Sequence, residues 1–306
     1  MPERASSGWP AAWPGSSNSI PDMAERLAPT RQANRAGGLG TPRARRHTLL
    51  LLLASLPMLL FLLVPVVALI VRVSPAVLLS NLAGREAAQA ISLSMLTTAI
   101  SLALAIAGGT PLAYLLARRR LPGRAALDTL IDLPMVLPPA VAGIGLLLAF
   151  GRRGLLGRYL ADASIEVAFT QAAVVLAQLF VAAPFYVKSA LAGFASVDHE
   201  LEQAAALDGA TPLGVFRHVT LPLAWPALFG GAVMTWARAL GEFGATIIFA
   251  GNFPGRTQTM PLAIYIGFEL ELNVALTLAI LLLAISFGVL LLVKGLLGWN
   301  GAERAA

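Results

Sequence analysis

Long stretches without a charged residue alternate with short polar segments along this chain of 306 residues. Each uncharged stretch reaches the roughly 20 residues that an α-helix needs to cross the ~30 Å hydrocarbon core of a bilayer. The stretches are continuous and rich in Leu and Ala rather than alternating, so strands are not expected. The pattern therefore predicts six transmembrane helices, at residues 47–71, 87–117, 133–151, 167–187, 218–237 and 272–293.

The composition supports this class of protein. Of all residues, 57% are hydrophobic and 12% are charged, whereas about a quarter of the residues in soluble domains are charged. The chain has no cysteine, which excludes disulfides and thiolate metal sites. Its three histidines, His47, His199 and His218, do not follow the spacing of metal ligands. We therefore expect an all-α polytopic protein surrounded by membrane lipid, with no bound metal or other cofactor and no nucleic-acid partner.

The two ends of the chain differ from the apolar region between them. Residues 1–46 are rich in Pro, Ser, Gly and Arg and lack apolar periodicity, so we predict a disordered tail. Residues 47–298 form the predicted membrane domain, and residues 299–306 form a short C-terminal tail. Lys and Arg concentrate on the cytoplasmic side of membrane proteins. Their distribution here predicts that both termini, and residues 197–222 between the fourth and fifth spans, are cytoplasmic.

Residues 197–222 are unusually polar for this chain. Their pattern predicts a short amphipathic helix, a break at Gly209, a second helical turn that begins at Pro212, and an exit into the next span at Pro222. Glycine permits a tight turn at the break because it has no Cβ. By shape alone, the segment is equally consistent with an ordinary solvated connection between two spans.

The spacing within this segment is more specific. The order is Gln203, Ala204 and Ala205, three residues, Gly209, nine residues, and then Val219, Leu221 and Pro222. This order resembles the EAA loop of ATP-binding-cassette importer permeases, although the family usually has Glu at the position of Gln203, which here follows Glu202. The resemblance implies the type I importer permease (MetI-like) fold and a loop that docks on a dimer of separate ATPase subunits. Those subunits would bind ATP and Mg²⁺, because this chain has no G-x-x-x-x-G-K-[ST] phosphate loop.

Two further stretches narrow the resemblance. Residues 132–157 (DLPMVLPPAVAGIGLLLAFGRRGLLG) and 237–265 (ARALGEFGATIIFAGNFPGRTQTMPLAIY) are similar to the permeases of bacterial molybdate importers, and the similarity extends over about residues 85–298. It implies that a homodimer of the chain imports molybdate across the inner membrane, supplied by a periplasmic molybdate-binding protein.

Other functions stay open at this point. Sulfate permeases, which also include thiosulfate importers, share the GEFGA sequence, and tungstate has the shape and charge of molybdate. An ion-coupled transporter would be expected to carry several buried acids. An alternative of another class is a polytopic membrane enzyme, for which the spans hold no constellation of His, Asp and Ser.

One pair of charges is a candidate for the translocation pathway. Arg238 and Glu242 stand four residues apart at the end of the fifth predicted span, the spacing that places two side chains on one helical face. A charge within the membrane is costly and marks a candidate functional site. We predict that Arg238 meets the oxyanion and that Glu242 partly neutralises the charge of Arg238, so that the cargo is released. The alternative is that Arg238 and Glu242 form a purely structural ion pair. Gly241 and Gly244 flank the pair and permit a bend at a gate or close helix packing.

Two other features concern the predicted outer side and the third span. Arg152 and Arg153 depart from the expected charge asymmetry, and we predict that they meet acidic residues of the binding protein. The alternative is that they lie in an ordinary solvated turn.

Pro134, Pro138 and Pro139 remove backbone donors from the third predicted span and therefore predict a kink.

Overall fold

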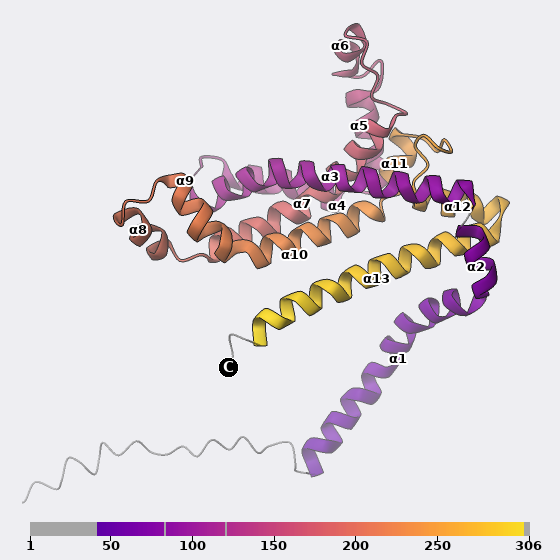
Figure 1. Ribbon diagram of the computed structural model, residues 1–306, viewed down its shortest axis with the longest axis horizontal. Coiled ribbons are helices and arrows are strands. Elements are labelled where there is room, and N and C mark those ends of the chain that lie inside the picture. The colour runs from indigo at the N-terminus through magenta and orange to yellow at the C-terminus, as the bar shows by residue number, and fades with distance from the viewer. Residues whose placement is uncertain (1–41, 83, 120, 303–306) are drawn as a thin grey trace, which may run out of the picture. The chain divides into compact units, whose positions relative to one another are not determined.

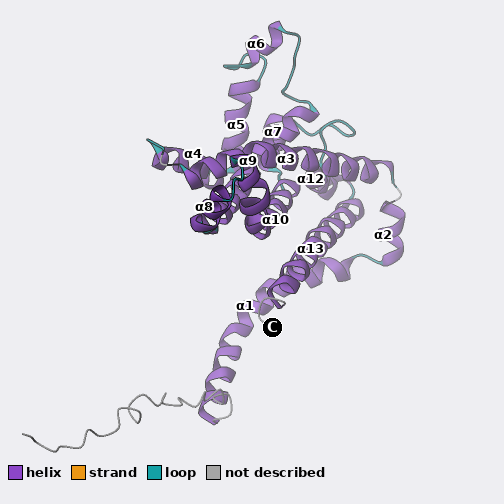
Figure 2. Ribbon diagram, turned by 60° about the vertical axis from the view of Figure 1, so that its left-hand side comes forward, coloured by secondary structure: helices purple, strands orange, loops and turns teal. Residues whose placement is uncertain are grey.

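The computed structural model describes residues 42–302 except Ala83 and Arg120. Within these residues every regular element is a helix, as the sequence predicts (Figures 1 and 2). The chain divides into two units, residues 1–63 and residues 64–306. The described part of the first unit is the beginning of α1 (Pro42–Arg72), whose apolar side chains are exposed. An apolar surface of this kind suits contact with lipid rather than with water.

Among the described residues, five helical segments are long and apolar enough to cross a membrane, and one bent pair of helices is a sixth if it counts as one span. The five lie in α1, in α3 (Arg85–Arg118), in α7 (Gln171–Ser196), in the continuous run of α9 (Pro212–Val215), η1 (Phe216–Thr220) and α10 (Leu221–Leu240), and in α13 (Leu272–Ala302). The bent pair is α4 (Arg124–Val136) with α5 (Pro139–Phe150). All six predicted spans therefore correspond to helical segments, the third of them as the bent pair.

The third predicted span, residues 133–151, falls on the bent pair, which begins earlier than predicted, at Arg124, and is kinked as the prolines predict. The helix axis turns by 114° between α4 and α5. Leu137 and Pro138 between them are extended, each with ψ of 133°. A residue before proline is disfavoured in the α conformation, and proline itself donates no backbone hydrogen bond. The proline kink is thus confirmed as a complete break, whereas Pro134 lies inside α4 and does not end it.

The predicted limits of the fourth and fifth spans are also corrected. α7 continues past Lys188 to Ser196, although the sequence pattern ends the fourth span before this lysine. The Lys188 Nζ lies 2.9 Å from Asp132 Oδ2 and 3.9 Å from Asp128 Oδ1, both on α4. Because the lysine is paired in this way, the helix can include it. The fifth span begins at Pro212, inside the segment predicted as a loop.

The helices at the ends of the chain extend into the predicted tails. α1 begins at Pro42 and α13 ends at Ala302. Residues 1–41 and 303–306, on which the rest of the tail predictions fall, lie outside the described residues. The hydropathy pattern does not predict four shorter helices, which are α2 (Pro75–Leu82), α6 (Gly157–Asp162), α11 (Gly244–Phe249) and α12 (Met260–Leu270).

Close contacts of small residues set the packing of α10 against α7. A Cβ added to Gly231 would lie 2.5 Å from the Cβ of Ser189, and a Cβ added to Gly193 would lie 2.7 Å from that of Ala227. The two helices are therefore antiparallel and in a fixed register. Arg238 lies about two turns beyond Gly231 on α10. In this register it is level with the middle of α7, which has 26 residues.

Candidate functional site

The polar segment after α7 forms a short helix with well-defined ends. α8 (His199–Leu207) and α9 lie together at one end of α3, α7 and α10 (Figure 1). The Asp198 side chain accepts a hydrogen bond of 2.9 Å from the Glu200 N–H and caps the start of α8. At its end Gly209 has φ of +89°, which favours glycine. The N–H groups of Gly209 and Ala210 donate to the carbonyls of Ala206 and Ala205, which closes the helix in a Schellman turn.

The chain then enters the membrane helix earlier than predicted. The Thr211 hydroxyl accepts a hydrogen bond from the Gly214 N–H, and Pro212 occupies the first turn. From there α9, η1 and α10 follow one another without a break, since the residues at both junctions are α-helical. The predicted second helical turn is present, but the predicted exit at Pro222 is wrong. Val219, Leu221 and Pro222 lie in the π-helical turn and the first turn of α10.

Several residues of this segment expose apolar surface. Gln203 and Ala204 of α8 are exposed, and Ala205 is half-buried. Leu207 is 89% exposed and Leu213, just after the turn, is 73% exposed. Large apolar side chains that stand out from a polar connection are typical of a surface that another protein covers.

Glu202 differs from its neighbours because it is buried. Its Oε1 lies 2.8 Å from the Arg118 Nη2 and accepts a hydrogen bond of 2.6 Å from the Thr220 hydroxyl. Its Oε2 lies 3.1 Å from the His199 Nδ1. Arg118 also donates to the Val197 carbonyl. We call Arg118, His199, Glu202 and Thr220 the Glu202 cluster.

The cluster keeps the carboxylate charged. Burial raises the pKa of Glu202, but the hydrogen bonds from Thr220, His199 and Arg118 and the charge of Arg118 outweigh burial, so the net pKa lies below its usual value. The ionised carboxylate therefore stabilises the fold at neutral pH, and this contribution is lost as the pH falls through the lowered pKa. This cluster is not predicted from local spacing, because Arg118 is 84 residues and Thr220 is 18 residues away from Glu202 in the sequence.

The second candidate site lies where α10 ends inside the membrane domain. The Arg238 Nη1 is 2.8 Å from the Glu242 Oε2, as the spacing predicts, although Glu242 lies two residues beyond the end of the helix. Glu242 is buried, and the Arg238 side chain is 31% exposed. The Glu242 Oε1 also accepts a hydrogen bond of 2.8 Å from the Ala245 N–H in the first turn of α11. Glu242 therefore both pairs with Arg238 and caps α11.

The two flanking glycines differ. A Cβ at Gly244 would lie 2.7 Å from the Pro139 Cβ, so the start of α11 packs tightly on the start of α5. A Cβ at Gly241 would lie 3.7 Å from the Ala237 carbonyl oxygen and meet no closer atom of the described residues. Close packing thus accounts for Gly244 but not for Gly241. Two breaks, after α4 and after α10, meet at this contact.

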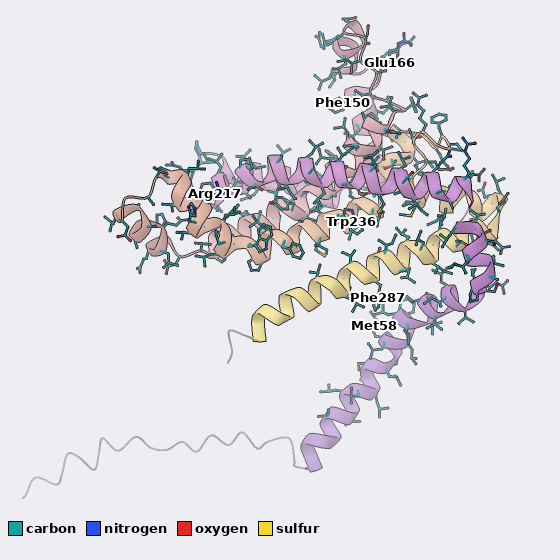
Figure 3. The ribbon with its side chains drawn as sticks, in the orientation of Figure 1. Met58, Phe150, Glu166, Arg217, Trp236 and Phe287 are labelled. Carbon is teal, nitrogen blue, oxygen red and sulfur yellow. The ribbon has the colours of Figure 1, made fainter. Side chains whose placement is uncertain are left out.

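Arg152 and Arg153 lie in the turn between α5 and α6, far from both sites in sequence. Both are exposed. The Arg152 Nε is 3.9 Å from the Glu166 Oε1, and both side chains are largely solvent-accessible, so the pair contributes little to stability. Figure 3 shows Glu166, the partner of Arg152, well apart from Trp236, which lies two residues before Arg238 on α10. The structure does not bring Arg152 and Arg153 together with Arg238.

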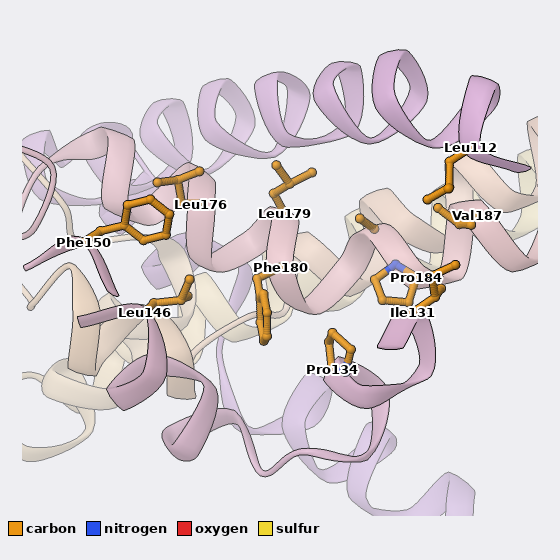
Figure 4. A pocket seen from close by; sticks show the side chains of 11 residues that line it. Leu112, Ile131, Pro134, Leu146, Phe150, Leu176, Leu179, Phe180, Pro184 and Val187 are labelled. Carbon is orange, nitrogen blue, oxygen red and sulfur yellow. The ribbon is translucent and has the colours of Figure 1, made fainter. Parts of the chain in front are cut away.

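A cavity of about 360 Å³ lies between α3, α4, α5 and α7 (Figure 4). No charged residue lines it, so it does not suit a divalent oxyanion. Its lining is Leu112, Ile131, Pro134, Leu146, Phe150, Leu176, Leu179, Phe180, Ala183, Pro184 and Val187. Across the described residues, no three His, Cys, Asp or Glu side chains group in a way that would hold a metal ion.

Comparison with known proteins identifies the class to which these features belong. Residues 109–296 match the family described as the binding-protein-dependent transport system inner membrane component. The chain belongs to this family of transport permeases. Its expected class, a permease rather than a membrane enzyme, is thereby confirmed.

Particular relatives narrow this class. The molybdenum transport system permease protein ModB of Mycobacterium tuberculosis is 44% identical over 228 residues, which are 74% of this chain and 86% of that protein. The sulfate transport system permease protein CysW of Synechococcus elongatus is 37% identical over 221 residues, 72% of this chain and 77% of that protein. A chain of a bacterial alginate ABC transporter, solved in complex with an alginate-pentasaccharide-bound periplasmic protein, is similar in structure. Its TM-score is 0.63 at 18% identity, over 83% of this chain and 94% of that chain, which supports the fold alone.

Proposed function

We propose that this chain is the membrane-spanning subunit of an ATP-driven molybdate importer in the inner membrane. The observation that carries the proposal is the similarity to a molybdenum permease along most of that protein's length. The sulfate permease is a less similar relative, so sulfate is the less favoured cargo. ATP and Mg²⁺ bind to a separate ATPase chain.

The ATPase docks on α8 and on the turn that follows it. This segment exposes Leu207 and Leu213, and the small residues Ala204 and Ala205 allow a close approach. Gly209 holds the turn between the two leucines in a left-handed conformation. The docking surface and both chain termini face the cytoplasm, as the distribution of Lys and Arg indicates.

The translocation pathway follows one face of α10. Gly230, Met234 and Arg238 stand four residues apart on this face, and none of them is buried. A second copy of the chain packs opposite this face and completes the pathway. Arg238 meets the oxyanion at the middle of the membrane, and Glu242 reduces its charge so that the anion is not held too tightly. The break at Gly241 provides the bend at the gate.

A periplasmic molybdate-binding protein delivers the anion at the other end of the pathway. Arg152 and Arg153 are exposed in the turn between α5 and α6 and are available to acidic residues of that protein. Selection between molybdate, tungstate and sulfate takes place mainly in the binding protein. The Arg238 charge in the permease is partly neutralised by Glu242, and the polar pocket beside α12 is lined by the carboxylates of Glu86 and Glu271, which repel an anion.

Uptake of labelled molybdate tests this function. Bacteria without their own molybdate permease would carry this chain together with its ATPase and binding protein, with and without excess sulfate. We expect uptake that sulfate does not reduce. Uptake abolished by sulfate would identify a sulfate importer, and absence of uptake would refute the proposal.

A matched pair of glycine variants then tests the docking turn. Gly209→Val places a β-branched residue at φ of +89° in the docking turn, and Gly123→Val does the same at φ of +77° in the connection between α3 and α4. Both sites have open space, so backbone strain is common to the two variants. Uptake should be lost in Gly209→Val and kept in Gly123→Val. Equal loss in both would show that strain alone, rather than docking, stops transport.

A further inference from the structure

Glu202 and Gln203 are neighbours in α8, but they face different surroundings. Glu202 is 7% exposed and contacts Arg118, His199 and Thr220 of the permease itself, whereas Gln203 is exposed. A protein that docks on α8 can reach Gln203 but not the carboxylate of Glu202. The acidic residue of this loop therefore acts within the permease.

The partners of Glu202 come from three helical segments. Arg118 is the last residue of α3, His199 is the first residue of α8, and Thr220 is the last residue of η1. The two shortest contacts, 2.8 Å to Arg118 and 2.6 Å to Thr220, are charge-assisted hydrogen bonds. Glu202 is thus the point at which α8 is attached to two membrane-spanning helices.

The attachment at Thr220 lies at a mechanically sensitive place. A π-helical turn is a local departure from α-helical geometry that often marks a functional position. The first residue of η1, Phe216, packs against the interior, with its ring centroid 5.0 Å from that of Tyr114 on α3 and 6.1 Å from that of Phe194 on α7. From η1, α10 continues as one helix to Leu240, next to the break at Gly241. A displacement of α8 therefore reaches the Arg238–Glu242 pair along a single helix.

We propose that Glu202 is a positioning residue that transmits movement of the docked α8 to α3 and α10, and that it takes no part in binding the ATPase. The proposal rests on the proposed function and adds the route of coupling. It separates two roles within α8: exposed residues hold the ATPase, and the buried carboxylate moves the membrane helices.

The test compares Glu202→Gln with Glu200→Gln in the complete transporter, reconstituted in liposomes with its ATPase and binding protein. Both variants remove one carboxylate charge from α8, but Glu200 is exposed. Two quantities are measured, the amount of ATPase that co-purifies with the permease and the molybdate transported per ATP hydrolysed. For Glu202→Gln we expect a normal amount of co-purified ATPase. The molybdate transported per ATP should fall by about tenfold or more, because a charge-assisted contact is lost. Glu200 lies on the docking surface but outside the Glu202 cluster, so Glu200→Gln should transport as much molybdate per ATP as the unmodified chain, whatever amount of ATPase co-purifies with it. Glu202→Asp should recover part of the coupling.

Two results would overturn the proposal. One is wild-type molybdate transport per ATP in Glu202→Gln, and the other is loss of the ATPase from its complex, which would assign Glu202 to docking. If the Glu202→Gln permease itself does not fold into the membrane, Thr220→Val removes one hydrogen bond of the cluster without changing charge. Undiminished coupling in that variant would equally contradict the proposal. Failure of the unmodified chain to bind an ATPase or to transport molybdate would instead refute the proposed function.

Discussion

Two buried glutamates, each 2.8 Å from an arginine, lie near the two ends of α10. Glu202 of α8 contacts Thr220, the residue before α10 begins, and Glu242 lies two residues after α10 ends. Glu242 pairs with Arg238 four residues earlier in sequence and caps the next short helix, so its contacts are local. Glu202 pairs with Arg118, 84 residues away, and joins three helical segments. A local pair can neutralise a charge at one place in the membrane. A pair between distant segments can also carry movement from one helix to another, and this difference separates a pathway residue from a coupling residue.

Removal of the arginine of the distant pair should have the largest effect on stability. Arg118→Ala leaves the buried carboxylate of Glu202 without its cation, and loss of one partner of a buried pair costs about 3–5 kcal/mol. Denaturant unfolding in detergent would measure the free energy of unfolding. Arg119→Ala is the matched control, because Arg119 is exposed and its loss should change this free energy by less than about 0.5 kcal/mol. Equal effects of the two variants would contradict the assignment of Glu202 to an interior cluster.

Two adjacent glycines of α10, Gly230 and Gly231, test how α10 packs against α7 and therefore whether Arg238 is level with the middle of α7. A Cβ at Gly231 would collide with Ser189, whereas a Cβ at Gly230 would meet no atom of the described residues within 4 Å. We expect Gly231→Ala to lower the free energy of unfolding by about 1–3 kcal/mol through overpacking. Gly230→Ala should leave stability unchanged or raise it by up to about 1 kcal/mol, because alanine favours a helix. The opposite order would mean that α10 presents a different face to α7.

The local pair should matter less for stability and more for transport. Arg238→Gln leaves Glu242 with its hydrogen bond from the Ala245 N–H. We therefore expect about 1–2 kcal/mol of destabilisation, less than for Arg118→Ala, since Arg238 is partly exposed. Molybdate transport in liposomes should nevertheless fall to background. Unchanged transport by an assembled complex would reduce the pair to a structural role.

The smallest effect should come from the residue beside Glu202. Gln203→Glu introduces the residue that the loop family usually has, at an exposed position of α8. Stability should change by less than about 0.5 kcal/mol, and molybdate transport per ATP should stay at the level of the unmodified chain. Loss of coupling in this variant would show that the exposed position, and not Glu202, controls transmission.

The sequence predicts those features that depend on local pattern. Hydropathy locates the membrane helices, the i,i+4 spacing brings Arg238 to Glu242, and glycine marks the left-handed turn at Gly209. Proline indicates the break in the third span, but not its angle, because the angle depends on what α5 packs against. Gly244 shows this dependence, since its contact is Pro139, more than a hundred positions earlier in the chain.

Features that depend on long-range contacts escape prediction. Lys188 ends an uncharged stretch, yet α7 includes it because Asp132 of another helix pairs with it. Arg118 resembles any other cation at the end of a span until folding brings it to Glu202. The residues around Lys188 do not indicate Asp132 as its partner, and those around Arg118 do not indicate Glu202. Span limits drawn from charge are therefore wrong at Lys188, and the site at Arg118 is not predicted.

The most direct test of the account is molybdate accumulation in liposomes that contain this chain, its ATPase and no other membrane protein, with the binding protein outside and ATP supplied to the ATPase. Molybdate should accumulate only when ATP, the ATPase, the binding protein and this chain are all present. Accumulation without the ATPase, or none with all components present, would contradict the proposed function.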